Sequence, residues 1–134
     1  MNTHAMAATT AVPVQSYRDL IAWRKSMELA REIYRVSETF PRIETYGLIS
    51  QMRRAAVSIP SKIAEGHERP SSDYRQFLGH ALGSLMEIET QVLLAESFAY
   101  LEKEKSERLL LRTAELAKIL HRLLRSLRIR MREN

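Results

Sequence analysis

Apolar residues recur at three- and four-residue spacing through most of this chain, and α-helices bury such a pattern on one side. Four glycines and four prolines in 134 residues leave few places for a helix to break. The breaks lie at Phe40-Pro41, at Gly66, and between Tyr100 and Lys103. They predict an all-α protein, an antiparallel up-down four-helix bundle with short connections.

Capping residues and the two termini set the limits of the bundle. The helices are expected at about residues 16–37, 44–65, 71–100 and 103–130. Gly66 is expected to end the second helix in a left-handed conformation. The domain division is an N-terminal disordered tail at 1–15, a bundle at 16–130 and a C-terminal tail at 131–134.

Each predicted helix has one apolar face that is suited to the core. The core positions are Leu20, Trp23, Met27, Ala30 and Tyr34 in the first helix; Leu48, Met52, Ala55, Ile59 and Ile63 in the second; Tyr74, Leu78, Ala81, Leu85, Ile88 and Val92 in the third; and Leu109, Leu116, Leu120, Leu123 and Leu127 in the fourth. A chain of this length buries such a core without disulfides.

Three of the helices carry a second apolar stripe, placed by 100° per residue. These stripes are Ala22, Leu29, Ile33 and Val36; Ile49, Val57, Pro60 and Ala64; and Gly79, Gly83, Thr90 and Leu94. Single exposed apolar residues are normal on a monomer, but aligned stripes need a partner surface. We therefore expect a homo-oligomer whose interface includes Ile49, Val57, Pro60, Gly79 and Gly83.

Two adjacent arginines in the second helix, Arg53 and Arg54, project about 100° apart. Glu89 of the third helix lies near its core-facing side, where a carboxylate needs a partner to stay ionised. We expect an ion pair among these residues, either between helices or between subunits. A role for the carboxylates in acid–base chemistry is the alternative, and no nucleophile or metal motif accompanies it.

The end of the fourth helix is strongly basic, within a chain of net charge +5. From Lys118 to Arg132 there is no acidic residue. The basic face opposite the leucines consists of Lys118, Arg122, Arg125 and Arg132, with His121 and Arg128 at its edge. Such a face predicts binding to the phosphate backbone of a nucleic acid. A solvated helix end that complements the helix dipole is the alternative.

Enzymatic motifs are missing from the sequence. The chain has no cysteine, and its four histidines show no Glu-x-x-His spacing, so we expect no metal, no cofactor and no catalytic residue. Arg75 and His80 have the Arg-x4-His spacing of HEPN-type ribonucleases, which leaves metal-independent RNA cleavage as a weaker alternative. No apolar run reaches the length of a membrane span and no signal peptide is visible, so a cytoplasmic protein is expected.

The order of motifs resembles the four-helix bundle family encoded in 23S rRNA intervening sequences, which includes the accessory variability determinant proteins of diversity-generating retroelements. The matching segments, which span about residues 17–125, are Leu20-Ile21-Ala22-Trp23, Phe40-Pro41, Tyr46-Gly47-Leu48, Gln51 to Pro60, Ile63-Ala64-Glu65-Gly66, Phe77-Leu78, Ala81 to Leu85 and Glu89-Thr90-Gln91. The chain departs from the family pattern at Lys62, His67 and His80.

This resemblance implies a ring-shaped homopentamer around a central channel. For the retroelement branch it also implies a basic surface that binds RNA and a reverse transcriptase. We therefore expect a non-enzymatic, ring-forming RNA adaptor with no membrane partner. The alternative is a protein-only scaffold whose basic face binds an acidic protein.

Overall fold

The computed structural model describes residues 16–133, and every regular element in that range is helical. The elements are η2 (Tyr17–Asp19), α1 (Ile21–Ser37), η3 (Arg42–Glu44), α2 (Leu48–His67), α3 (Ser71–Ser97) and α4 (Lys103–Glu133). The predicted tail at 1–15 lies outside the described residues. The predicted tail at 131–134 is wrong for residues 131–133, because they continue α4.

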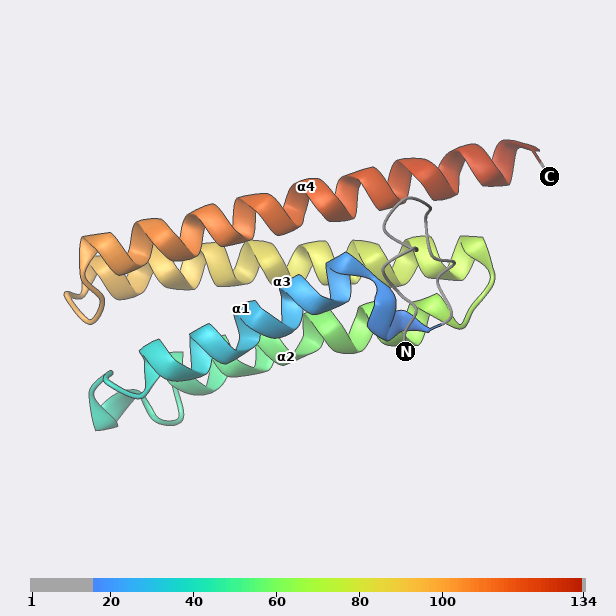
Figure 1. The fold of residues 1–134 in the computed structure, drawn as a ribbon. Helices are drawn as coiled ribbons and strands as arrows, with labels where there is room; N and C mark the ends of the chain where they lie inside the picture. Colours follow the sequence, from blue (N-terminus) through green and yellow to red (C-terminus); the bar gives the residue numbers. More distant parts are fainter. Residues whose placement is uncertain (1–15, 134) are drawn as a thin grey trace, which may run out of the picture.

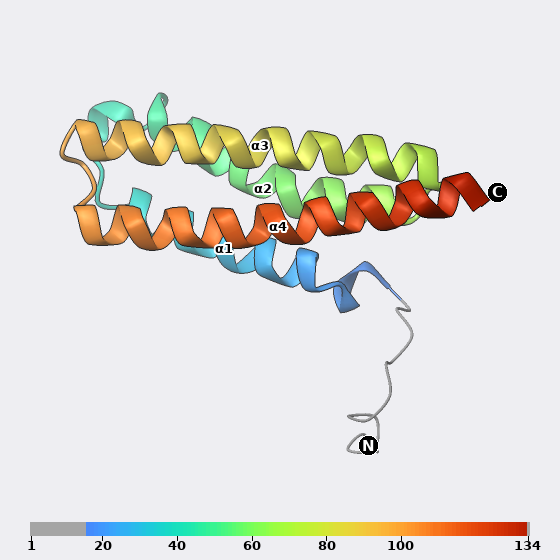
Figure 2. The same cartoon turned by 90° about the horizontal axis from the view of Figure 1, so that it is seen from above.

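The four long helices lie side by side with alternating directions, which confirms the up-down bundle (Figures 1 and 2). Each helix packs on the next along the chain, and α4 also packs on α1. Residues 38–47 and 98–102 form one end of the bundle, which we call the loop end. The other end contains residues 66–75 and the last turns of α4, and we call it the basic end. No helix in the described part of the chain is long and apolar enough to cross a bilayer.

The core faces of α2, α3 and α4 are those that the sequence predicts. Every predicted core residue on these three helices is buried except Leu123, which is half-buried. Their leucines, isoleucines and alanines repeat at the helical period, so one face of each helix closes against the others. Residues from three helices therefore supply most of the interior.

The two faces of α1 are reversed with respect to the prediction. The buried apolar residues are Ala22, Leu29, Ile33 and Val36, which the sequence places on an oligomer surface. Tyr34, predicted in the core, is 43% exposed, while Trp23 and Met27 are half-buried. Both faces of this helix are apolar, and compact aliphatic side chains fill the narrow space beside α2 and α4 better than amphipathic aromatic ones.

The loop end is closed by a network of side-chain hydrogen bonds. Glu44 Oε1 accepts a hydrogen bond of 3.0 Å from the Leu48 amide at the start of α2, and Glu44 Oε2 accepts one of 2.9 Å from the Tyr100 hydroxyl. Gly47 leaves room for that carboxylate, because a Cβ at this position would lie 2.8 Å from Glu44 Oε1. One acidic side chain thus caps α2 and ties it to the turn before α4.

The α3–α4 turn reverses the chain with a left-handed residue. Ala99 has φ 63°, the one non-glycine residue with positive φ in the described range. The Ala99 amide bonds the Glu96 carbonyl, and the Tyr100 amide bonds the Ala95 carbonyl. This is the Schellman arrangement, which normally takes glycine at the left-handed position.

Gly66 does not have the left-handed conformation that the sequence predicts. It lies inside the last turn of α2, and none of the described glycines has positive φ. A Cβ on Gly66 would lie 2.7 Å from Phe77 Cβ and 2.9 Å from Tyr74 Cδ1. Gly66 therefore serves close packing of α2 against α3 and not the termination of the helix.

Candidate functional site: an apolar groove and a basic helix half

A groove of about 560 Å³ runs along the outer side of α1 and α2. Its lining includes Trp23, Met27, Ala30 and Tyr34 from α1 and Val57, Pro60 and Ala64 from α2. Four of the five side chains that the sequence assigns to the core of the first helix thus face this groove, and Leu20 does not. The other wall is formed by three residues of the second apolar stripe of α2, which are Val57, Pro60 and Ala64.

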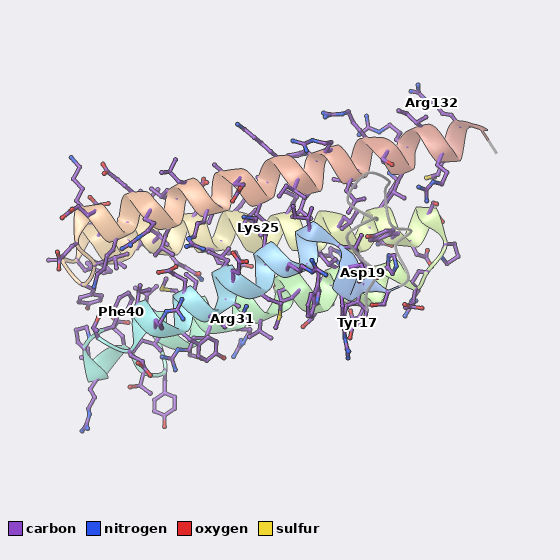
Figure 3. The ribbon with its side chains drawn as sticks, viewed as in Figure 1. Tyr17, Asp19, Lys25, Arg31, Phe40 and Arg132 are labelled. Atoms are coloured by element: carbon purple, nitrogen blue, oxygen red, sulfur yellow. The ribbon has the colours of Figure 1, made fainter. Side chains whose placement is uncertain are left out.

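Cationic side chains border the groove. Arg31 and Arg35 of α1 take part in its lining, and Tyr17 lies at one end of it (Figure 3). Arg35 Nη2 is 4.0 Å from Glu32 Oε1, which is a marginal ion pair between an exposed arginine and a largely buried glutamate. Sequence periodicity does not reveal this border, because it places the groove wall in the core.

The predicted interface residues lie on two separate faces of the bundle. Val57 and Pro60 line the groove, and Ile49 is half-buried against the core on the same helix. Gly79 and Gly83 lie on the exposed side of α3, where an added Cβ would meet nothing within 4 Å. Further residues exposed on this side are Met86, Thr90, Leu93 and Leu94. We call this second surface the α3 face.

Arg53 binds α1 and not α3. Its Nε donates to Ser37 Oγ at 2.9 Å and its Nη2 to the Tyr34 carbonyl at 3.2 Å, while the guanidinium lies 4.5 Å from the centre of the Tyr34 ring. Within one described chain, neither Arg53 nor Arg54 forms an ion pair with Glu89. The intrachain form of the predicted pair is therefore wrong, because a hydroxyl, a carbonyl and an aromatic ring satisfy Arg53 instead. A pair between subunits remains a prediction.

Arg54 lines a polar cleft between α2 and α3. The cleft has a volume of about 330 Å³, and its other lining residues are Gln51, Ala55, Ser58, Ser84 and Glu87. The Ser58 and Ser84 hydroxyl groups are joined by a hydrogen bond of 2.6 Å across the helix pair. Glu87 also borders the α3 face, so this face has an acidic edge.

Helix α4 divides into two halves of different electrostatic character. In the first half, Arg112 pairs with Glu32 at 3.5 Å and with Glu28 at 3.8 Å, both on α1. In the second half, Lys118, Arg122, Arg125, Arg128 and Arg132 are all exposed. None of these five forms an ion pair with another described side chain. The positive charge predicted for this half is thus displayed to solvent, with Arg132 at its far end (Figure 3).

The ribonuclease-like pair is not assembled in the structure. Arg75 Nη1 lies 3.9 Å from Met131 Sδ of α4, while His80 is exposed and its ring packs edge-on against Phe77. No hydrogen bond joins Arg75 and His80 in the described chain. Among residues 16–133, no cluster of three or more histidine and acidic side chains is arranged to hold a metal ion.

Comparison with known proteins gives a family and a fold. The family model described as 23S rRNA-intervening sequence protein matches residues 18–122. A protein with unknown function from the S23 ribosomal protein family of Bacteroides thetaiotaomicron has a similar solved structure, with a TM-score of 0.71 at 23% identity. That match covers 78% of this chain and 96% of the other. No curated protein matches the sequence.

Proposed function

The chain belongs to the 23S rRNA-intervening sequence protein family, and from that premise we propose that it is a non-enzymatic, cytoplasmic protein that assembles with copies of itself and binds RNA. The observation that carries the RNA proposal is the difference between the two halves of α4. Opposite charges pair in the first half, whereas the exposed cations from Lys118 to Arg132 form no ion pair with a described side chain. When such unpaired cations bind a polyphosphate backbone, the counterions condensed on that backbone are released, which favours binding.

Self-association is supported by two apolar surfaces on different sides of one bundle. The groove is concave and bordered by Arg31 and Arg35, while the α3 face has exposed glycines and an acidic edge at Glu87. If the α3 face of one copy fills the groove of the next, unlike surfaces meet and opposite charges come together. Such head-to-tail contacts close into a ring when the rotation from one copy to the next divides a full turn, and otherwise form an open filament. We propose a homopentamer, the number that the family resemblance implies, with a reverse transcriptase as partner if the protein belongs to a retroelement.

A pair of charge reversals tests RNA binding. We expect Arg122→Glu with Arg125→Glu to weaken binding of a structured RNA by roughly tenfold or more, and the slope of its salt dependence to fall by about one for each phosphate that is no longer bound. Lys103→Glu with Lys105→Glu changes the same charge at the other end of α4, where both lysines are exposed, and should leave binding nearly intact. Equal RNA affinity in all three proteins would contradict the proposal. Binding of an acidic protein in place of RNA would support the scaffold alternative.

A second substitution tests the assembly. Val57 is 45% exposed in one chain and lines the groove, so Val57→Glu places a charge inside the proposed interface. We expect light scattering to give the mass of an oligomer for the parent protein and a smaller mass for this variant. Leu111→Glu is the matched control, because Leu111 is 72% exposed on α4, away from the groove lining. A parent protein that is a single folded chain would refute the assembly.

A further inference from the structure

Three buried polar atoms without a hydrogen-bond partner gather at the basic end. They are His67 Nδ1 in the last turn of α2, and Tyr74 Oη and Arg75 Nε in the first turn of α3. The rings of His67 and Tyr74 meet edge to face, with centroids 5.8 Å apart. Buried polar groups are nearly always paired, so a cluster of unpaired ones indicates a missing partner. Gln91 Oε1, also unpaired, lies apart from this cluster, further along α3.

The cluster is strongly positive. Arg75 has one contact to its guanidinium, a distance of 3.9 Å from Nη1 to Met131 Sδ, and a thioether is a weak acceptor. Burial raises the pKa of Tyr74, and the positive charge of Arg130 on α4 opposes part of that rise. Neither Arg75 nor Arg130 forms an ion pair with any side chain described in the structure. Arg75 and Arg130 are thus two cations without a paired carboxylate among the described side chains.

The unpaired groups are donors or can become donors. The Tyr74 hydroxyl and the Arg75 Nε–H both donate, and His67 donates from Nδ1 in one of its neutral tautomers. Tyr74 is only 7% exposed, so its hydroxyl cannot find bulk water as a partner. A partner that accepts hydrogen bonds and carries negative charge suits these donors and the two arginines. A phosphate group meets both requirements, and arginine binds it with charge-assisted hydrogen bonds.

We propose that the basic end binds a phosphate group of RNA, with Arg75 and Tyr74 as hydrogen-bond donors and Arg130 as a supporting charge. The identity of the ligand as RNA rests on the proposed function, whereas the affinity for phosphate does not. Arg128 and Arg132 are exposed on the same last turns of α4 as Met131, so one RNA backbone can occupy the exposed cations and this cluster together. Binding moves the Met131 side chain away from Arg75, so that the shielded donors become accessible and a phosphate oxygen replaces the thioether as the acceptor of Arg75.

Titration of the protein with inorganic phosphate and pyrophosphate tests the site directly. In nitrogen-15 NMR spectra at constant ionic strength, either anion should shift the Arg75 Nε–H resonance and the Tyr74 amide, and chloride should not. Arg75→Gln should weaken phosphate binding roughly tenfold or more, the effect of losing a hydrogen bond to a charged group. Arg42→Gln removes the same charge from an exposed position at the loop end and should leave binding unchanged.

Tyr74→Phe separates binding from folding. Because the Tyr74 hydroxyl has no partner in the free protein, its removal should maintain or raise the melting temperature while phosphate affinity falls several-fold. A variant that melts at a lower temperature and binds phosphate normally would overturn the assignment. So would a parent protein in which neither phosphate nor pyrophosphate moves these resonances.

Two RNA oligonucleotides, one with a 5′-phosphate and one with a 5′-hydroxyl, identify the phosphate source. Tighter binding of the first that disappears in Arg75→Gln assigns a terminal phosphate. Equal binding of both that weakens in Arg75→Gln assigns an internal phosphodiester. If phosphate binds but RNA does not, the RNA function fails and the site remains. If RNA binding is abolished in Arg122→Glu with Arg125→Glu yet unaffected by Arg75→Gln, the phosphate site fails and the RNA function remains.

Discussion

Each end of the bundle carries a tyrosine at or next to a helix terminus, and the two tyrosines differ in whether the hydroxyl has a hydrogen-bond partner. At the loop end, Tyr100 donates to Glu44, which also caps α2. At the basic end, Tyr74 is buried and its hydroxyl has no hydrogen-bond partner in the described chain. The pKa of Tyr100 is raised by its hydrogen bond to Glu44, with smaller contributions from burial and from the charge of that carboxylate. Burial raises the pKa of Tyr74 to about 12, and the charge of Arg130 opposes part of that rise.

This difference indicates separate roles for the two ends. The loop end joins α2, α3 and α4 through a closed set of hydrogen bonds, so its polar groups stabilise the bundle. The basic end leaves donors and cations unused, at a cost in stability for each unpaired group. Groups that cost stability in a free protein are characteristic of binding sites. The loop end therefore stabilises the fold, and we infer that the basic end binds a ligand.

Alkaline unfolding should give the largest difference between the ends. The folded pKa of Tyr74, about 12, lies above the usual value of 10, so its contribution to stability is complete below pH 10 and is lost as pH rises through 12. The unfolding free energy of the parent, measured relative to that of Tyr74→Phe, should fall by roughly 2 to 3 kcal/mol between those limits. Urea unfolding of both proteins at intervals from pH 9 upward measures this difference. Parallel curves would show that Tyr74 ionises freely in the folded protein.

Gly66→Ala should destabilise the basic end through packing. The new Cβ would lie 2.7 Å from Phe77 Cβ, so α2 and α3 must separate, at a net cost of about 2 kcal/mol despite the better helix propensity of alanine. Gly79→Ala is the control, because an added Cβ there meets nothing and should stabilise by about 0.5 to 1 kcal/mol. Both are measured by urea unfolding in the Val57→Glu background, where assembly does not contribute. Equal effects of the two substitutions would refute the close-packing role of Gly66.

Glu44→Ala should weaken the loop end by about 1 to 2 kcal/mol, because the Leu48 amide loses its cap. The pKa of Tyr100 should move down toward its usual value, since the hydrogen bond that raises it is gone. Chemical unfolding and an ultraviolet titration of tyrosine measure the two effects. Glu38→Ala, at an exposed position of the same loop end, should change neither. A Tyr100 pKa that stays raised would argue against the network.

Ala99→Gly should strengthen the loop end by about 0.5 to 1 kcal/mol, because glycine adopts the left-handed conformation without the penalty that alanine has there. The melting temperature and the urea midpoint measure this gain. The reverse sign is expected for Ala114→Gly at an exposed site inside α4, with a loss of about 1 kcal/mol. A loss at both positions would mean that the turn is not held in the Schellman arrangement.

The periodicity of the sequence predicts the four helices and three of their core faces. It does not determine which face of α1 is buried, because Trp23 and Met27 on one side are as apolar as Leu29 and Ile33 on the other. The space beside the neighbouring helices decides which face is buried, and the sequence of one helix does not contain that information. The family resemblance is confirmed by the match over residues 18–122. The ring, the pentamer and the RNA surface remain predictions.

The candidate site is less accessible to sequence reasoning than the fold. The exposed cations of α4 are visible as a run of arginines, and the structure confirms their exposure. Charge alone suggests a carboxylate as the partner of Arg53, yet Ser37 and Tyr34 bind it, and neither carries a charge to signal the contact. The cluster around Tyr74 and Arg75 joins residues from α2, α3 and α4, and an unsatisfied donor exists only once the chain has folded around it.

The groove between α1 and α2 contains Trp23, the single tryptophan of the chain. Indole emission shifts to shorter wavelength when water is removed from around the ring. Any molecule that covers the groove, including a neighbouring copy, therefore changes the intrinsic fluorescence of the unlabelled protein. Dissociation on dilution should appear as a red shift, which gives this surface its own optical reporter.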